Sequence, residues 1–173
     1  MIPVISLIVS VLGLIAALLI PVKVMWNQAF IDLNSTYMGY DYADALNEII
    51  NFFYEKCHKN FDEIEKEYKR RYYEDFKEKG TPKKQPLHYQ RRLVAQFYYN
   101  LDVCTGLFGI RPSLVRKLYT KNEKELLKII FYMNQAVENS PDIYKDISTS
   151  ERLVERKNVS KINRHIYHLY KIL

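Results

Sequence analysis

The sequence predicts an all-α protein, with one N-terminal transmembrane helix followed by a compact bundle of five or six short helices. Two observations lead to this prediction. All 46 charged residues lie beyond position 22, so the opening segment carries no side-chain charge. From about residue 40 onward, apolar residues recur at three- and four-residue spacing, which is the period of an amphipathic helix. No segment alternates over the length that a β-strand requires.

The opening segment, residues 2–22, is long and apolar enough to span a bilayer. Fourteen of its 21 residues are Leu, Ile or Val, and together they favour insertion by about 4 to 8 kcal/mol. A helix of this length covers about 30 Å, the thickness of the hydrocarbon core. A cleaved signal peptide and a buried core helix are the alternatives. We favour an anchor, because the apolar run is long, no basic residue precedes it and no small-x-small cleavage site closes it.

The predicted organisation is a transmembrane anchor at 1–26, a neck or membrane-helix extension at 27–40, and a cytosolic helical bundle at 41–173. Two cysteines, Cys57 and Cys104, cannot form a disulfide framework, which favours a reducing compartment. Lys23 follows the span directly and supports a cytoplasmic C-terminal domain. The expected location is a bacterial inner membrane, crossed once.

The bundle is predicted from apolar stripes and helix-start signals. Asp41 is the expected cap of the first helix, and Asn60 with Glu63 makes a capping-box-like start to the second. The third helix is expected to bury the stripe from Leu93 to Phe108. The residues predicted to form the core are Leu46, Ile50, Phe53, Ile64, Phe97, Leu101, Leu127, Ile130, Phe131, Ile162 and Ile166.

Charge is distributed unevenly along the bundle. Residues 41–80 have a net charge of −3, residues 83–118 of +6 and residues 151–173 of +4. The candidate basic surface comprises Lys83, Lys84, Arg91, Arg92, Arg111, Arg116 and Lys117. We expect acidic and basic helices to face one another within the bundle. Attraction to anionic membrane lipid is the main functional alternative, and we do not expect nucleic-acid binding.

The motifs that carry chemistry are incomplete in this chain. Glu55 and His58 form a single E-x-x-H, whereas carboxylate-bridged di-iron sites need two. His165 and His168 lie one helical turn apart, but zinc sites use three or four protein ligands. We therefore predict no catalytic residue, no metal site and no cofactor. In the span, small residues four apart permit close helix contact and a homo-oligomer; they are Ser6, Ser10, Gly13 and Ala17.

The layout resembles a family of small bacterial single-pass membrane proteins of unknown function. The likeness rests on the N-terminal span, on HYQRRLVAQFYYNLDVCTGLFGIRPSLVRKLY at 88–119 and on LLKIIFYMNQAVE at 126–138. It implies a bacterial inner membrane and brings no catalytic residue. The function expected is a membrane-tethered helical module that engages a protein partner or a larger assembly. A membrane-acting effector or sensor, for example in phage defence, and an enzyme with an unrecognised site are the alternatives.

Overall fold

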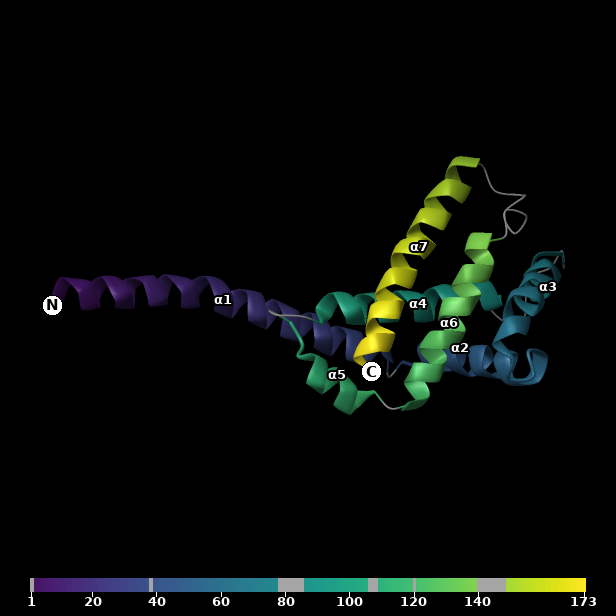
Figure 1. Cartoon of the computed structure of the whole chain (residues 1–173), viewed down its shortest axis with the longest axis horizontal. Helices are drawn as coiled ribbons and strands as arrows, with labels where there is room; N and C mark the ends of the chain where they lie inside the picture. The colour runs from purple at the N-terminus through teal and green to yellow at the C-terminus, as the bar shows by residue number, and fades with distance from the viewer. Residues whose placement is uncertain (1, 38, 78–85, 106–108, 120, 140–148) are drawn as a thin grey trace.

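The structure is a computed structural model that describes residues 2–37, 39–77, 86–105, 109–119, 121–139 and 149–173. These residues are almost entirely helical and contain no β-strand, which confirms the predicted all-α class. One long helix is followed by a bundle (Figure 1). The elements are α1 (Ile2–Tyr37), α2 (Tyr40–Asn51), a π-helical turn (Phe52–Lys56), a 3-10 turn (Phe61–Glu63), α3 (Ile64–Lys77), α4 (Leu87–Cys104), α5 (Pro112–Leu118), α6 (Lys121–Asn139) and α7 (Thr149–Ile172).

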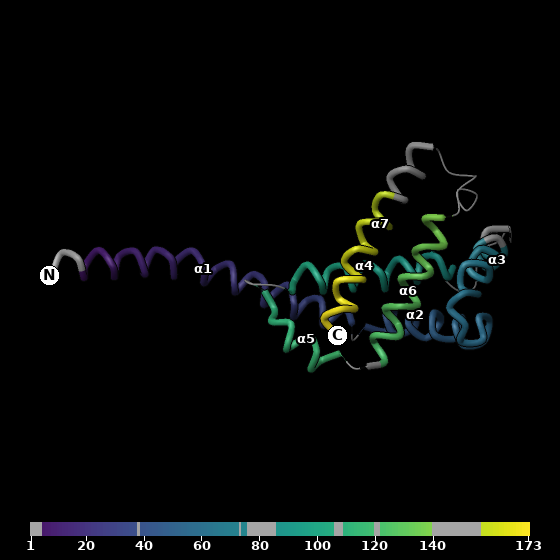
Figure 2. Tube along the Cα trace, in the orientation of Figure 1, coloured from purple at the N-terminus to yellow at the C-terminus, as the bar shows by residue number. Residues whose placement is uncertain are grey.

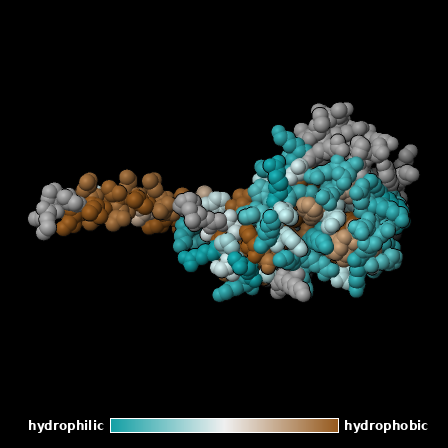
Figure 3. Space-filling model, viewed as in Figure 1, coloured by the Kyte–Doolittle hydropathy of each residue, from teal (hydrophilic) through white to brown (hydrophobic). Residues whose placement is uncertain are grey.

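Helix α1 has two parts with different surroundings. Its first part is apolar on every side and projects away from the bundle, as the brown rod in Figure 3 shows. The large apolar side chains from Ile5 to Met25 are exposed. Its last three turns belong to the bundle, where Leu33 is buried and Phe30 and Tyr37 pack against the core. The helix is thus long and apolar enough to cross a membrane, and it continues without interruption into the folded domain.

The chain reverses direction between α2 and α3. His58 and Lys59 adopt positive φ angles of 50° and 62°, which allow a tight reversal after the π-helical turn. Asn60 then caps the next element, because its side-chain oxygen accepts a hydrogen bond from the backbone N–H of Asp62 at 3.1 Å. The predicted helix start at Asn60 is therefore confirmed. The predicted cap at Asp41 is wrong, since Gly39 is the N-cap of α2 and Asp41 lies in its first turn.

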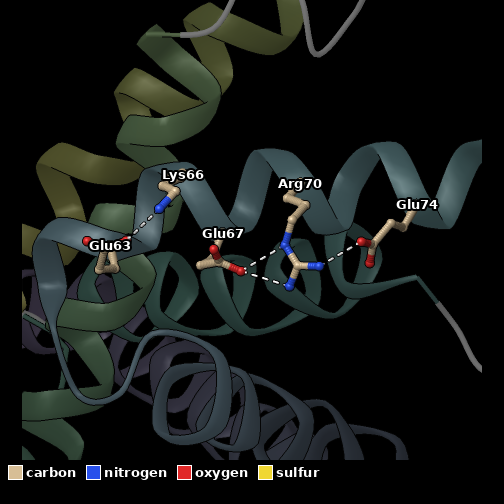
Figure 4. A network of polar contacts seen from close by, with 5 residues as sticks. All are labelled: Glu63, Lys66, Glu67, Arg70 and Glu74. Carbon is tan, nitrogen blue, oxygen red and sulfur yellow. Dashed lines mark hydrogen bonds and ion pairs between the residues drawn. The ribbon is translucent and has the colours of Figure 1, made fainter.

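Helix α3 pairs most of its charged residues with one another. Figure 4 shows Arg70 between Glu67 and Glu74, with Lys66 beside Glu63. Two further pairs, Lys69–Glu65 and Arg71–Asp75, join residues that are four apart. Such exposed pairs contribute about 0.2 to 0.5 kcal/mol each. They satisfy many charges within the helix, and Asp75 also accepts a hydrogen bond from the backbone N–H of Leu87 on α4 at 3.1 Å.

Helix α4 lies at the centre of the bundle and packs against α1, α2, α6 and α7. Figure 2 shows α6 and α7 running beside each other and crossing α4. The core forms where these helices meet, and most predicted core residues lie in it. The buried ones are Phe53, Ile64, Phe97, Leu101, Leu127, Ile130 and Ile166, whereas Leu46, Phe131 and Ile162 are partly buried against them.

The predicted core position Ile50 is wrong. Its side chain is 38% exposed, whereas the adjacent Ile49 is fully buried. Successive residues of an α-helix are rotated by about 100°, and α2 contacts the core through a face narrow enough to bury only the first of the two isoleucines. Tyr42, Ala45 and Ile49 form the buried stripe of α2, and this stripe leaves Ile50 on its flank.

Candidate functional site between α4 and α7

The central helix α4 buries two charged residues of opposite sign, one near each end. Arg91 is 1% exposed and Asp102 is 7% exposed. Charged side chains are rarely buried unless other polar groups satisfy them. The partners of both residues come from other helices, and these contacts define the polar architecture of the bundle.

Arg91 organises a buried network that joins four helices. Its Nε donates to the Tyr68 hydroxyl of α3 at 3.0 Å, and its Nη1 donates to the side-chain oxygen of Asn134 on α6. The amide of Asn134 in turn donates to the Oδ1 atom of Asn163 on α7 at 2.8 Å. Because each partner is itself buried or lies at a helix interface, the network fixes how α3, α6 and α7 dock on α4.

The same network holds His88 in its neutral form. The Tyr68 hydroxyl lies 3.1 Å from His88 Nδ1. This hydroxyl, which accepts from Arg91, can donate its own proton to Nδ1 when the imidazole carries its proton on Nε2. Burial lowers the pKa of His88 to about 3, and the nearby positive charge of Arg91 contributes to the shift. His88 is therefore a structural acceptor and remains uncharged at neutral pH.

At the other end of α4, the Asp102 carboxylate holds two histidines of α7. Its Oδ2 lies 2.8 Å from His165 Nδ1 and its Oδ1 lies 2.7 Å from His168 Nδ1. A carboxylate only accepts hydrogen bonds, so both Nδ1 atoms carry protons. In the neutral rings, each Nε2 is then a free proton acceptor. The His165 side chain is 31% exposed and that of His168 is 62% exposed, so both can be reached from solvent.

A cationic cavity lies between α4 and α7, close to these histidines. Its volume is about 270 Å³, and among the residues whose side chains the structure describes its lining includes the cations Arg91, Arg92 and Lys161. Gln96 and Asn158 add amide groups. This is the lining that a bound carboxylate or phosphate group requires, because guanidinium and ammonium groups supply charge-assisted hydrogen bonds.

Tyr99 connects the cavity to the histidine pair. It lines the cavity, its ring contacts that of His165 edge-on with centroids 4.7 Å apart, and Lys161 lies 5.3 Å from the ring centre. We name the cavity, Tyr99 and the Asp102-held histidines together the α4–α7 site. Tyr99 therefore separates the cavity from His165, and His168 lies further along α7.

The predicted basic surface does not form one patch. Lys83 and Lys84 lie outside the described residues. Arg91 was predicted to be on the surface, and this is wrong, because it is buried in the network described above. Arg92 is exposed at the cavity, whereas Arg111, Arg116 and Lys117 are exposed on or beside α5. The described residues of the predicted basic surface therefore lie in three places: Arg91 is buried, Arg92 lines the cavity, and the other three are on or beside α5.

The other candidate residues are placed individually. Cys57 and Cys104 are buried free thiols, and burial raises the pKa of Cys57 to about 12. His58 is exposed at the chain reversal. Among the described residues, no group of three or more His, Cys, Asp and Glu side chains is arranged to hold a metal ion. On α1, the small residues of the predicted contact face are exposed, and the Ser10 hydroxyl donates to the backbone oxygen of Ser6.

The sequence does carry a signal for the α4–α7 site. Arg91, Val94, Tyr98, Leu101 and Asp102 follow the three- and four-residue spacing of one helix face. A buried face drawn through these residues, in place of the face through Leu93, places both charged residues in the interior. Leu93 itself is 36% exposed. The partners of Arg91 lie 23 and 43 residues away and those of Asp102 lie 63 and 66 residues away in the chain, so local spacing alone does not identify them.

Comparison with models of known protein families, with curated proteins and with solved structures finds no match to this chain.

Proposed function

We propose that the protein is a membrane-tethered binding module, anchored by α1 and recognising a protein partner through the α4–α7 site. The observation that carries this proposal is the division of α1. One half has no contact with the rest of the described chain, and the other half is part of the core. A water-soluble domain does not leave so large an apolar surface uncovered, and lipid is the natural environment for it.

The charge near the span and the state of the cysteines indicate which side of the membrane the bundle faces. Lys23 is exposed directly after the apolar half of α1. Basic residues near the end of a span favour the cytoplasmic side. Both cysteines are free, as is usual in a reducing compartment. The bundle accordingly faces the cytoplasm of a bacterial cell, beneath the inner membrane.

The partner is recognised through its negative charge. The lining of the α4–α7 site includes the exposed side chains of Arg92 and Lys161, with Gln96 and Asn158 as hydrogen-bonding neighbours. Its size suits one or two side chains and not an extended ligand. We therefore propose that an acidic side-chain group of a partner protein inserts between α4 and α7.

Membrane fractionation tests the tether. The full chain is expected to sediment with membranes and to resist extraction at alkaline pH, whereas a variant lacking residues 2–22 is expected to be soluble and still helical by circular dichroism. Protease added to inside-out vesicles should digest the bundle, and protease added to right-side-out vesicles should not. A full chain that is soluble without detergent would overturn the proposal.

Affinity capture from detergent extracts tests the partner. The double variant Arg92→Glu/Lys161→Glu should lose a partner that wild type retains reproducibly. Lys56→Glu/Lys66→Glu makes the same charge change at exposed positions away from the cavity and serves as the matched control. If both double variants retain the partner equally, the cavity is not the binding site.

One observation favours the second alternative, an enzyme. A carboxylate that orients an imidazole beside a substrate pocket is the arrangement used for general-base catalysis, and Asp102 orients two. Hydrolysis of phosphate or carboxylate esters by the purified full chain, lost in His165→Gln but retained in His58→Gln, would replace a pure binding role with catalysis. The prediction of a homo-oligomer through the Ser6–Ala17 face stays a prediction, to be tested by cross-linking in vesicles.

A further inference from the structure

Helix α5 presents an exposed surface that is both cationic and apolar. Arg111, Arg116 and Lys117 are exposed, and Leu114 and Leu118 are 43% and 50% exposed. The described residues supply no ion pair for these three cations. We name these five residues the α5 surface. A helix with exposed leucines one turn apart and three unpaired cations is unusual on a water-facing side and is typical of contact with a membrane interface.

The α5 surface is fixed in position by the buried side of its own segment. Val115 is completely buried, and Ile110 and Tyr119 are nearly so. The Ile110 N–H donates to the carbonyl oxygen of Cys104 at 2.8 Å, which ties the start of the segment to the end of α4. The Tyr119 ring contacts Tyr37 at the end of α1, with centroids 5.6 Å apart. The segment therefore cannot move independently of α1.

This position is the side of the bundle nearest the apolar half of α1. Val103 and Cys104, at the end of α4, share a cleft with Ala29 and Leu33 of α1, and Figure 1 shows α5 lying alongside the part of α1 that enters the bundle. Ala29 is seven residues beyond Val22, or about 10 Å along the helix axis. Tyr37, which Tyr119 contacts, is fifteen residues beyond Val22, or about 22 Å along the helix axis. The headgroup layer occupies roughly 5 to 7 Å beyond the hydrocarbon core, so Arg111 at the start of the segment lies nearest to it, and a tilt of α1 towards α5 brings the rest of the α5 surface closer.

We propose that the α5 surface docks on the anionic headgroups of the leaflet from which α1 emerges. With α1 tilted towards α5, Arg111, Arg116 and Lys117 contact the lipid phosphates, and Leu114 and Leu118 face the headgroup layer. The proposal rests on the membrane tether proposed above. Charge complementarity selects lipid as the occupant, because three cations on a segment held at a bilayer surface face a negative potential. Together they favour the docked state over the free state about a hundredfold.

The test uses the full chain in lipid nanodiscs and hydrogen–deuterium exchange. The backbone amides of residues 112–119 should exchange at least tenfold more slowly in discs containing phosphatidylglycerol than in pure phosphatidylcholine, and high salt should remove the difference. The triple variant Arg111→Glu/Arg116→Glu/Lys117→Glu should show no dependence on lipid charge. Lys56→Glu/Lys66→Glu/Lys157→Glu makes the same change at exposed positions elsewhere and should behave as wild type.

The outcomes separate the two proposals. If the chain does not enter nanodiscs, the tether itself fails. If it enters and α5 exchanges at the same rate in both lipids, docking is overturned while the tether stands. If soluble glycerol phosphate gives the same protection in phosphatidylcholine discs, the surface binds free anions and lipid docking is also overturned. Unchanged exchange in α6 verifies that the triple variant is folded.

Discussion

Acidification should weaken the bundle through His88. The imidazole is 6% exposed, accepts the Tyr68 proton and contacts the Tyr72 ring edge-on at 5.4 Å. Its pKa is about 3 in the folded protein, against about 6.5 in an unfolded chain. Between these values the unfolded chain binds one proton more than the folded one, so the stabilisation is fully present above pH 6.5 and is lost as the pH falls.

The magnitude follows from the same shift. One proton contributes about 1.4 kcal/mol per pH unit, so a change from about pH 7 to pH 5 crosses about 1.5 units of the window and should remove about 2 kcal/mol. Below pH 3 the folded protein also binds the proton, and the loss attributable to His88 stops growing. The shift therefore predicts both the size of the effect and the pH at which it ends.

Urea unfolding of the full chain in mild detergent measures this effect. Wild type and His88→Gln are compared at about pH 7 and pH 5, with helix content followed by circular dichroism. Glutamine keeps a hydrogen-bonding group near Tyr68 but does not titrate. All other ionisable groups are common to both proteins, so they cancel in the difference between the two pH responses. The reasoning is refuted if wild type and His88→Gln lose the same stability on acidification.

Three further predictions concern packing, thiol chemistry and the α4–α7 site. Ile49→Ala should cost about 2 to 5 kcal/mol of unfolding free energy and Ile50→Ala less than about 1 kcal/mol in urea titrations, because only the first side chain is fully buried; equal losses would show that the face of α2 is wrongly assigned. Cys57, with a pKa of about 12, should react with a thiol reagent at about pH 8 only after unfolding, since the thiolate is the reactive form; rapid labelling of native protein would contradict this. Asp102→Asn removes a charged acceptor for two imidazoles and should lower stability by about 1 to 3 kcal/mol, measured as a shift in the urea midpoint; an unchanged midpoint would show that the histidine contacts do not hold α7.

Much of the fold could be predicted from the sequence because its signals are local. The charge-free opening requires no knowledge of other residues, and the structure leaves that segment exposed. The same holds for Asn60, whose cap depends on an N–H two residues away. Most predicted core residues are buried as well, since a three- and four-residue apolar stripe has only one way to face a neighbouring helix.

The site could not be predicted in the same way because its stabilising contacts are distant. Arg91 can be buried only because Tyr68 and Asn134 accept hydrogen bonds from its guanidinium group. These two residues lie 23 and 43 positions away in the chain. Likewise, Asp102 looks like a surface charge until α7 brings two imidazoles to it, 63 and 66 positions later. Composition and spacing predict solvent exposure for a lone charge. Only tertiary contacts reverse that expectation.

The junction between α1 and the bundle has a mechanical consequence. Tyr37, on the last turn of α1, donates a hydrogen bond to Glu123 of α6 at 2.7 Å, and Tyr98 of α4 donates to the other oxygen of the same carboxylate. Burial, together with this carboxylate, raises the pKa of Tyr37, so the hydroxyl stays protonated and remains a donor. A flexible linker would let the bundle rotate freely beneath its anchor. Here the anchor ends inside the core, so a change in the tilt of α1 must also move α4 and α6, and with α4 one wall of the α4–α7 site.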